Sequence, residues 1–158
     1  MYKVERLLCP TDFSEGSLQA LSAATDIAAK LGAELSIVHV VPIMSTLPTD
    51  PNFVFEVHQR QDSLFGEMEK RLYEVARESK DKGILGRVFV GHGDAAAEIV
   101  RVAEEQKIDL IVIATFGKTG WRRVAFGSVT EKVVRLSPCP VLVVRGIEER
   151  IRAEEAVA

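Results

Sequence analysis

The sequence is poor in the residues that most often bind metals. Its 158 residues include two cysteines and three histidines, and no cysteine–histidine group has the spacing of a metal site. Cys9 and Cys139 each lie in or beside an apolar run, where a buried free thiol is more common in an intracellular protein than a disulfide. The sequence therefore predicts no metal centre and two free thiols, with a disulfide between them as the alternative.

Long hydrophobic runs and an excess of positive charge are absent as well. No apolar run approaches the ~18 residues that a membrane span needs. Lys3, Glu5 and Arg6 stand where a signal peptide would carry its apolar core. The net charge is −3 and the pI about 5.7, whereas proteins that bind nucleic acid usually present a broad basic surface. We expect a cytoplasmic protein that binds neither membranes nor nucleic acid.

Short runs rich in valine, isoleucine and leucine recur along the whole chain. Because they are nearly continuous rather than alternating with polar residues, they are typical of strands buried on both faces of a parallel sheet. The predicted strands are residues 4–9, Glu34–Val41, residues 87–90, Leu110–Ala114 and Val141–Val144.

Amphipathic stretches with helical spacing fill the intervals between these runs. The predicted helices are residues 14–31 with Ser14 as N-cap, residues 61–82, a third capped by Asp94 and a fourth that opens at Ser128. Such alternation predicts one α/β domain with a doubly wound, five-stranded parallel sheet and helices on both faces. We place this domain at residues 1–146, followed by a charged tail at residues 147–158.

Residues 42–60 are the one irregular stretch of the sequence. They carry three prolines, and Phe53 and Phe55 look exposed. A loop of this length in a compact domain is often a functional lid. It follows the second strand, so we expect it at the carboxyl edge of the sheet, where ligands bind in this architecture.

The segment of residues 114–130, which follows the fourth strand, is the densest in glycine, hydroxyl and basic residues. Gly127 and Ser128 open a helix whose N-terminus favours negative charge. Ser128 and Thr130 can add hydroxyl donors, and basic side chains supply local positive charge; these are Lys118, Arg122 and Arg123. The segment predicts an anion site. The alternative for its second half is a capping box from Ser128 to Glu131, which any stable helix can use.

Other candidate residues follow the first three strands. Asp12 either assists the turn into the first helix or accepts hydrogen bonds from an adenine or a ribose, and the sequence leaves both roles open. His39 and His92 are expected near the same edge in packing or hydrogen-bonding roles. The stretch from Gly91 to Asp94 fits a turn and a helix cap better than a dinucleotide fingerprint, because the acidic partner about twenty residues later is missing.

No catalytic constellation stands out in the sequence. The P-loop pattern fails because Val112 occupies the position of its first glycine. No Ser-His-Asp group, paired carboxylates or nucleophile elbow is present. We therefore expect at most slow, incidental hydrolysis of a bound nucleotide.

Three stretches together resemble the universal stress protein family. They are residues 7–14, residues 117–133 and residues 138–144. ATP-binding members carry Gly-x-x-Gly, nine residues, then Gly-Ser or Gly-Thr. Here Gly117 is the second glycine and Gly127-Ser128 closes the pattern, whereas Ala114 replaces the first glycine and Phe116 stands where histidine or arginine is frequent.

The resemblance implies an adenine nucleotide alpha hydrolase-like sheet of order 3-2-1-4-5 that binds ATP or another adenine nucleotide, with Mg²⁺. It implies these site residues: Pro10, Thr11, Asp12 and Val40 at the adenine, Ile113 and Ala114 at the ribose, and Gly117, Gly127, Ser128, Val129 and Thr130 at the phosphates. It also implies a homodimer through the last strand, Val141–Val144. The expected function is an ATP-dependent regulatory module in stress response. The alternative is a dimeric interaction protein of the same fold that binds no nucleotide.

Overall fold

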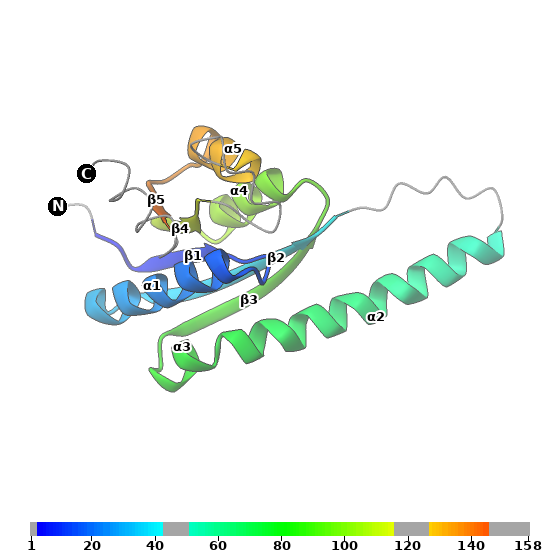
Figure 1. Ribbon diagram of the computed structural model, residues 1–158, viewed down its shortest axis with the longest axis horizontal. Helices are drawn as coiled ribbons and strands as arrows, with labels where there is room; N and C mark the ends of the chain where they lie inside the picture. The colour runs from blue at the N-terminus through cyan, green and yellow to red at the C-terminus, as the bar shows by residue number, and fades with distance from the viewer. Residues whose placement is uncertain (1–2, 43–50, 116–126, 146–158) are drawn as a thin grey trace, which may run out of the picture.

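The computed structural model describes residues 3–42, 51–115 and 127–145, and of residues 51–62 it describes the backbone alone. Its centre is a five-stranded, all-parallel sheet of order β3-β2-β1-β4-β5 (Figure 1). The strands are β1 Arg6–Pro10, β2 Glu34–Val41, β3 Leu85–His92, β4 Leu110–Ala114 and β5 Val141–Val144. The predicted fold class and strand order are confirmed.

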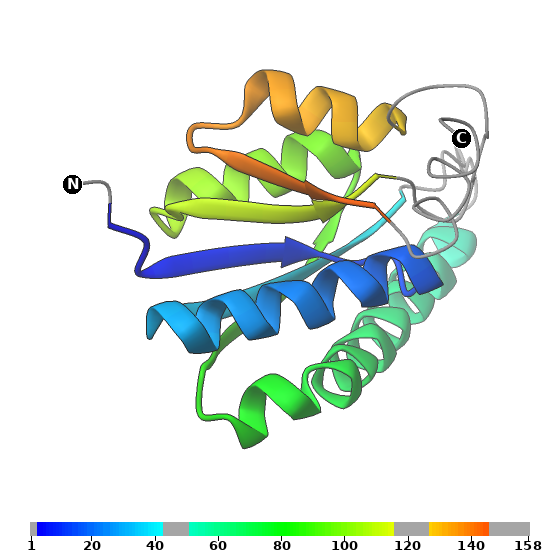
Figure 2. The same cartoon turned by 60° about the vertical axis from the view of Figure 1, so that its left-hand side comes forward.

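Helices cover both faces of the sheet, as Figure 2 shows. They are α1 Glu15–Leu31, α2 Pro51–Val75, α3 Arg77–Asp81, α4 Ala95–Glu105 and α5 Ser128–Leu136. Side chains of α1 and α2 share one buried cluster with the sheet, and those of α4 and α5 share another. Among the described residues no helix is long and apolar enough to cross a membrane.

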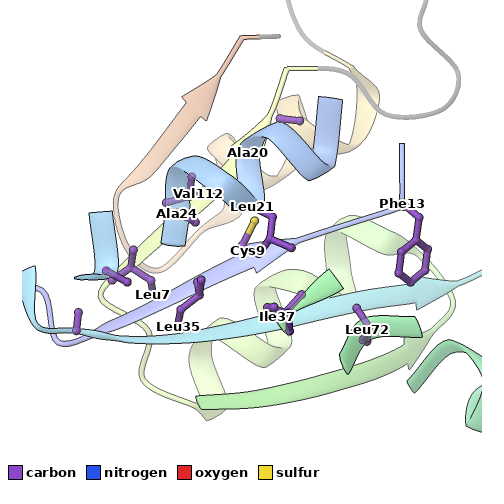
Figure 3. Close-up of a cluster of buried hydrophobic side chains, with 14 residues drawn as sticks. Leu7, Cys9, Phe13, Ala20, Leu21, Ala24, Leu35, Ile37, Leu72 and Val112 are labelled. Atoms are coloured by element: carbon purple, nitrogen blue, oxygen red, sulfur yellow. The ribbon is translucent and has the colours of Figure 1, made fainter. Parts of the chain in front are cut away.

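The central strand β1 contributes to both hydrophobic clusters. Leu7 and Cys9 point into the cluster under α1, and Leu8 points into the cluster under α4 and α5 (Figure 3). All three are fully buried, which explains why the strand reads as a continuous apolar run. Burial raises the pKa of the Cys9 thiol to about 12, so the thiol stays protonated. Cys9 and Cys139 are both free, and the disulfide alternative is wrong.

The caps predicted for α1 and α4 are formed. The Ser14 side chain accepts a hydrogen bond from the Ser17 amide at 3.3 Å, and Asp94 Oδ1 accepts one from the Ala97 amide at 2.9 Å. Gly32 ends α1 with φ 64°, a left-handed conformation that glycine adopts without steric cost. These local signals fix where the two helices begin and where α1 ends.

The predicted third strand, residues 87–90, is too short, because β3 spans Leu85–His92. Its extra residues include two glycines that read as strand breakers. A Cβ at Gly86 would meet the Glu34 side chain at 2.3 Å, and a Cβ at Gly91 would meet Glu98 Cγ at 2.3 Å. Gly91 belongs to the strand because it pairs with Val40 of β2, and Gly86 lies at the register shift opposite Leu35 and Ile37. The first strand is also shifted, from residues 4–9 to Arg6–Pro10.

The irregular stretch predicted at residues 42–60 is wrong in its second half. Helix α2 begins at Pro51, where a proline fits because the first helical residue needs no intrahelical N–H bond. Figure 1 shows the first half of α2 running past the carboxyl ends of the strands. The single helix predicted over residues 61–82 is two helices, α2 and α3. Residues 43–50 and the side chains of Phe53 and Phe55 lie outside the described residues.

Candidate functional site

The candidate site lies at the carboxyl ends of β1 and β4. These strands are hydrogen-bonded neighbours, although β2 and β3 come between them in the chain and lie on the far side of β1. This is the point where the strand order reverses. In open parallel sheets, ligands bind in the crevice outside such a point. The turn after β1 and Thr115, which directly follows β4, therefore lie at the edge where a ligand is expected.

A hydrogen-bond network fixes the turn after β1. Thr11 is 4% exposed, and its amide donates to the Val38 carbonyl at 2.9 Å. Its hydroxyl accepts from the Phe13 amide at 3.1 Å and lies 2.9 Å from the Ser17 hydroxyl. Because the Ser17 hydroxyl donates to the Ser14 carbonyl, Thr11 is the donor in that pair. The buried threonine thus holds the turn rigidly.

Asp12 has the turn role that the sequence allowed. Its Oδ1 accepts a hydrogen bond from the Ser14 amide at 3.0 Å, which leads the chain into α1. The residue is partly exposed, while its neighbours Pro10 and Thr11 are buried. Val40, near the end of β2, packs against the cluster of α4 and α5. Since Pro10 pairs with Val38 in the sheet, Val40 lies two residues further toward the same edge.

Phe13 is a feature of the site that the sequence did not predict. Its φ is 62°, a left-handed conformation that costs a side-chain-bearing residue about 1–2 kcal/mol. The centroid of its ring lies 4.6 Å from that of the His39 ring. The guanidinium carbon of Arg71, a residue of α2, lies 4.3 Å from the centroid of the Phe13 ring. The Phe13 ring thus packs against both His39 and Arg71, and these contacts stabilise the strained turn.

His39 is buried beside this turn. Its Nδ1 lies 2.8 Å from the Thr11 carbonyl oxygen. Because a carbonyl oxygen only accepts, Nδ1 carries the proton. His92 ends β3, and its ring lies edge-on to Phe65 of α2 with 6.0 Å between centroids. Both histidines have the packing and hydrogen-bonding contacts expected for them.

The last two residues of β4 point to opposite faces of the sheet. Ile113 belongs to the cluster of α4 and α5, and Ala114 to the cluster under α1. Ala114 is 6% exposed, so its methyl group packs in the protein core. Its carbonyl accepts a hydrogen bond of 2.7 Å from the Thr130 hydroxyl. Thr130 therefore uses its hydroxyl proton inside the protein and keeps only its amide for a ligand.

Thr115 brings together the two ends of residues 116–126. The Gly127 amide donates to the Thr115 carbonyl at 2.8 Å. The Thr115 amide and hydroxyl both donate to the Val144 carbonyl, at 2.9 Å and 2.8 Å. Sequence reasoning missed Thr115, and the available signal was a hydroxyl residue directly after a buried strand. Gly117 and Phe116, like the basic residues Lys118, Arg122 and Arg123, lie outside the described residues.

The N-terminus of α5 lacks the capping box that the sequence left open as an alternative. The N-cap is Gly127, with no side-chain cap hydrogen bond, and Ser128 is the first helical residue. The capping-box alternative is therefore wrong, because Ser128 lies one position too late to cap. The first N–H groups of any helix have no intrahelical acceptor. Ser128 and Val129 are exposed at this end of the helix.

An ion pair joins the N-terminus of α4 to α5. The Lys132 ammonium lies 3.2 Å from Asp94 Oδ2. The Ala97 amide and then the Lys132 side chain lower the pKa of the Asp94 carboxyl, so Asp94 is ionised at neutral pH. The Lys132 ammonium therefore pairs with a carboxylate of the protein itself. In the described part of the chain, no group of three His, Cys, Asp or Glu side chains could hold a metal ion.

Comparisons with known proteins extend over nearly the whole chain. A family model described as the universal stress protein family matches residues 3–145. The chain is 35% identical over 145 residues to the universal stress protein MJ0531 of Methanocaldococcus jannaschii, covering 92% of this chain and 83% of that protein. The structure is similar to that of MJ0577 from the same organism, with a TM-score of 0.74, 29% identity and coverage of 92% and 97%.

A further solved structure carries a nucleotide. It is a universal stress protein in complex with cAMP, with a TM-score of 0.60 and 26% identity. The match covers 90% of this chain and 97% of that one. Together with the extent of the family match and the sheet order, these similarities show that the chain belongs to the universal stress protein family.

Proposed function

We propose that this protein binds ATP, or another adenine nucleotide, and acts in the cytoplasm as a regulatory module of stress response. The observation that carries the proposal is the N-terminus of α5 at the point where the strand order reverses, where the N-cap is Gly127 and has no side chain to accept from the first amides. A helix N-terminus presents backbone N–H groups and a positive dipole end, the two features that phosphate groups favour. The cAMP complex of a relative supports a nucleotide as the ligand.

The phosphates would lie on the first turn of α5. We assign them to the amides of Ser128, Val129 and Thr130, with the exposed Ser128 hydroxyl as a further donor. Gly127, whose amide is bonded to the Thr115 carbonyl, would border the phosphates without donating to them. Gly117 keeps its predicted role there as part of this proposal. The Thr130 hydroxyl has a separate task, because its bond to the Ala114 carbonyl fixes the helix against β4.

The base and ribose would lie toward β1 and β2. Pro10, Thr11, Asp12 and Val40 are assigned to the adenine, and Ile113 and Ala114 to the ribose. Thr11 is buried and bonded within the turn, so the partly exposed Asp12 is the group that would address the ligand. The methyl group of Ala114 packs in the core under α1, which supports nucleotide binding despite the missing first glycine.

A divalent ion would reach this site with the nucleotide. Mg²⁺ is usually bound through phosphate oxygens, waters and one or two carboxylates rather than by a protein cage. The described residues offer no cluster of three ligating side chains, which fits an ion carried by the phosphates. We propose no catalytic residue. The carboxylates of Asp12 and Asp94 each accept a hydrogen bond from a backbone amide at the start of a helix, so both have a structural role.

The nucleotide that co-purifies with the protein tests the proposal. Denaturing the purified protein and separating the supernatant by nucleotide chromatography should release adenine nucleotide in near-stoichiometric amount. If none is released and added Mg-ATP leaves the melting temperature unchanged, nucleotide binding fails. The remaining candidate is then an interaction protein of the same fold that binds no nucleotide.

We further propose a homodimer in which β5 meets its copy in a second subunit. Strand β5 ends the sheet order, and an uncovered edge strand offers a template for pairing. Leu142, in the middle of β5, is 40% exposed, and Val134 and Leu136 of α5 are also exposed. Apolar side chains on an edge strand and a neighbouring helix favour an isologous contact about a two-fold axis.

Sedimentation velocity at micromolar concentration should give a dimer for the natural sequence and a monomer for Leu142→Glu. The carboxylate would be buried without a partner at the centre of the contact, which is strongly unfavourable. Leu31→Glu is the matched control, because Leu31 is 53% exposed at the end of α1, and it should remain dimeric. A natural protein that sediments as a monomer excludes the homodimer.

A further inference from the structure

Thr115 connects the start of α5 to the end of β5 through hydrogen bonds that involve its backbone and its side chain. It is 4% exposed, and each of its polar groups has a protein partner. Its carbonyl accepts from the Gly127 amide at 2.8 Å, directly before α5. Its amide and its hydroxyl both donate to the Val144 carbonyl, the last carbonyl of β5, at 2.9 and 2.8 Å.

The hydroxyl bond is an addition to ordinary strand pairing. Ala114 pairs with Val144 in the parallel ladder, and the Thr115 amide continues that ladder to the Val144 carbonyl. Since β5 ends the sheet order, β4 is its neighbour in the sheet. Within the sheet, hydrogen bonds that hold the end of β5 in place therefore come from β4 and the residue that follows it. The second bond to one carbonyl restricts how the ends of β4 and β5 move relative to each other.

We propose that Thr115 is a positioning residue for Gly127 and the first turn of α5: through its hydroxyl bond to the Val144 carbonyl it holds them in the geometry that binds phosphates. This inference rests on the proposed nucleotide-binding function. Backbone amides bind a phosphate well only when they are held in place before it arrives, because ordering them on binding weakens affinity. Thr115 supplies that order through a chain of three hydrogen bonds from Gly127 to β5.

The role can be isolated with two substitutions at one position. Thr115→Val keeps the side-chain shape and the amide bond to Val144, so the carbonyl retains a partner and the fold is kept. Thr115→Ser restores the hydroxyl and removes the methyl group. Thr25→Val is the control for the loss of a buried threonine hydroxyl. Thr25 is 1% exposed, and its hydroxyl donates to the Leu21 carbonyl at 2.9 Å within α1 and lies 2.8 Å from the Ser79 hydroxyl of α3.

Amide hydrogen exchange of the ligand-free protein tests the positioning directly. The Gly127 amide should exchange about fivefold faster in Thr115→Val, as expected for the loss of one buried hydrogen bond next to it. Thr115→Ser and Thr25→Val should leave this rate near that of the natural sequence. An unchanged rate in Thr115→Val overturns the proposal, whether or not the protein binds a nucleotide.

Isothermal titration with ATP and with adenosine tests the consequence for binding. Thr115→Val should raise the Kd for ATP about fivefold and leave that for adenosine within twofold, because only ATP carries phosphates. Equal weakening of both ligands, or a Thr115→Ser that behaves like Thr115→Val, contradicts a positioning role of the hydroxyl. If the natural protein binds neither ligand, the proposed function fails, and the exchange of Gly127 still decides whether Thr115 orders the segment.

Discussion

Replacing Gly127 with aspartate should abolish nucleotide binding while leaving the protein folded. A carboxylate at the N-cap of α5 would stand where the phosphates are assigned. Two like charges about 4 Å apart repel by about 4 kcal/mol at an effective dielectric constant of about 20. We therefore expect the Kd for ATP to rise by at least about 100-fold, measured by isothermal titration.

The same substitution should not harm the fold. Gly127 has φ −65° and ψ 155°, a conformation open to any L-residue. Aspartate is a favoured N-cap, and its charge suits the positive end of the helix dipole, so the melting temperature should stay equal or rise. The control is Gly66→Asp on α2, where a Cβ meets nothing within 4 Å, and it should bind ATP normally. Tight ATP binding by Gly127→Asp would contradict the assigned phosphate position.

Replacing Leu72 with alanine should lower the free energy of unfolding by about 2–5 kcal/mol, as buried leucines typically do. Leu72 is 0% exposed and joins α2 to the cluster of the sheet and α1 (Figure 3). The loss comes from buried apolar surface and from the cavity that remains. Urea denaturation followed by circular dichroism measures it.

Leu64→Ala on the same helix is the comparison for this prediction. Leu64 is 37% exposed, so its truncation should cost less than about 1 kcal/mol. Similar losses for both variants would mean that α2 does not dock through Leu72. In that case the contact of Arg71 with Phe13, one residue earlier on α2, would also need revision.

The sequence carried enough information for the architecture. Strands β2, β4 and β5 have the predicted bounds, because strands buried on both faces read as unbroken apolar runs. Ser14 and Asp94 marked helix starts because a cap is a local interaction. The strand order depended on the family resemblance, since periodicity does not say which strands are neighbours.

The remaining differences come from contacts between distant residues. Gly86 and Gly91 belong to β3 because this stretch pairs with β2, and no local pattern reveals that pairing. Helix α5 begins after Gly127, whose amide is bonded to Thr115, so the capping-box alternative, which rested on spacing alone, is wrong. The positive φ of Phe13 likewise depends on side chains from β2 and α2.

Because Thr115 and Gly127 are hydrogen-bonded at 2.8 Å, the segment between them begins and ends at nearly one point in space. The entropy of closing such a segment grows slowly with its length, by about 0.6 kcal/mol for each doubling. A change in the length of this connection should therefore alter the free energy of unfolding by only a few tenths of a kcal/mol up to about 0.6 kcal/mol. The position of the first turn of α5 is thus set by two residues at the mouth of the connection, Thr115 and Gly127, rather than by the length of chain between them.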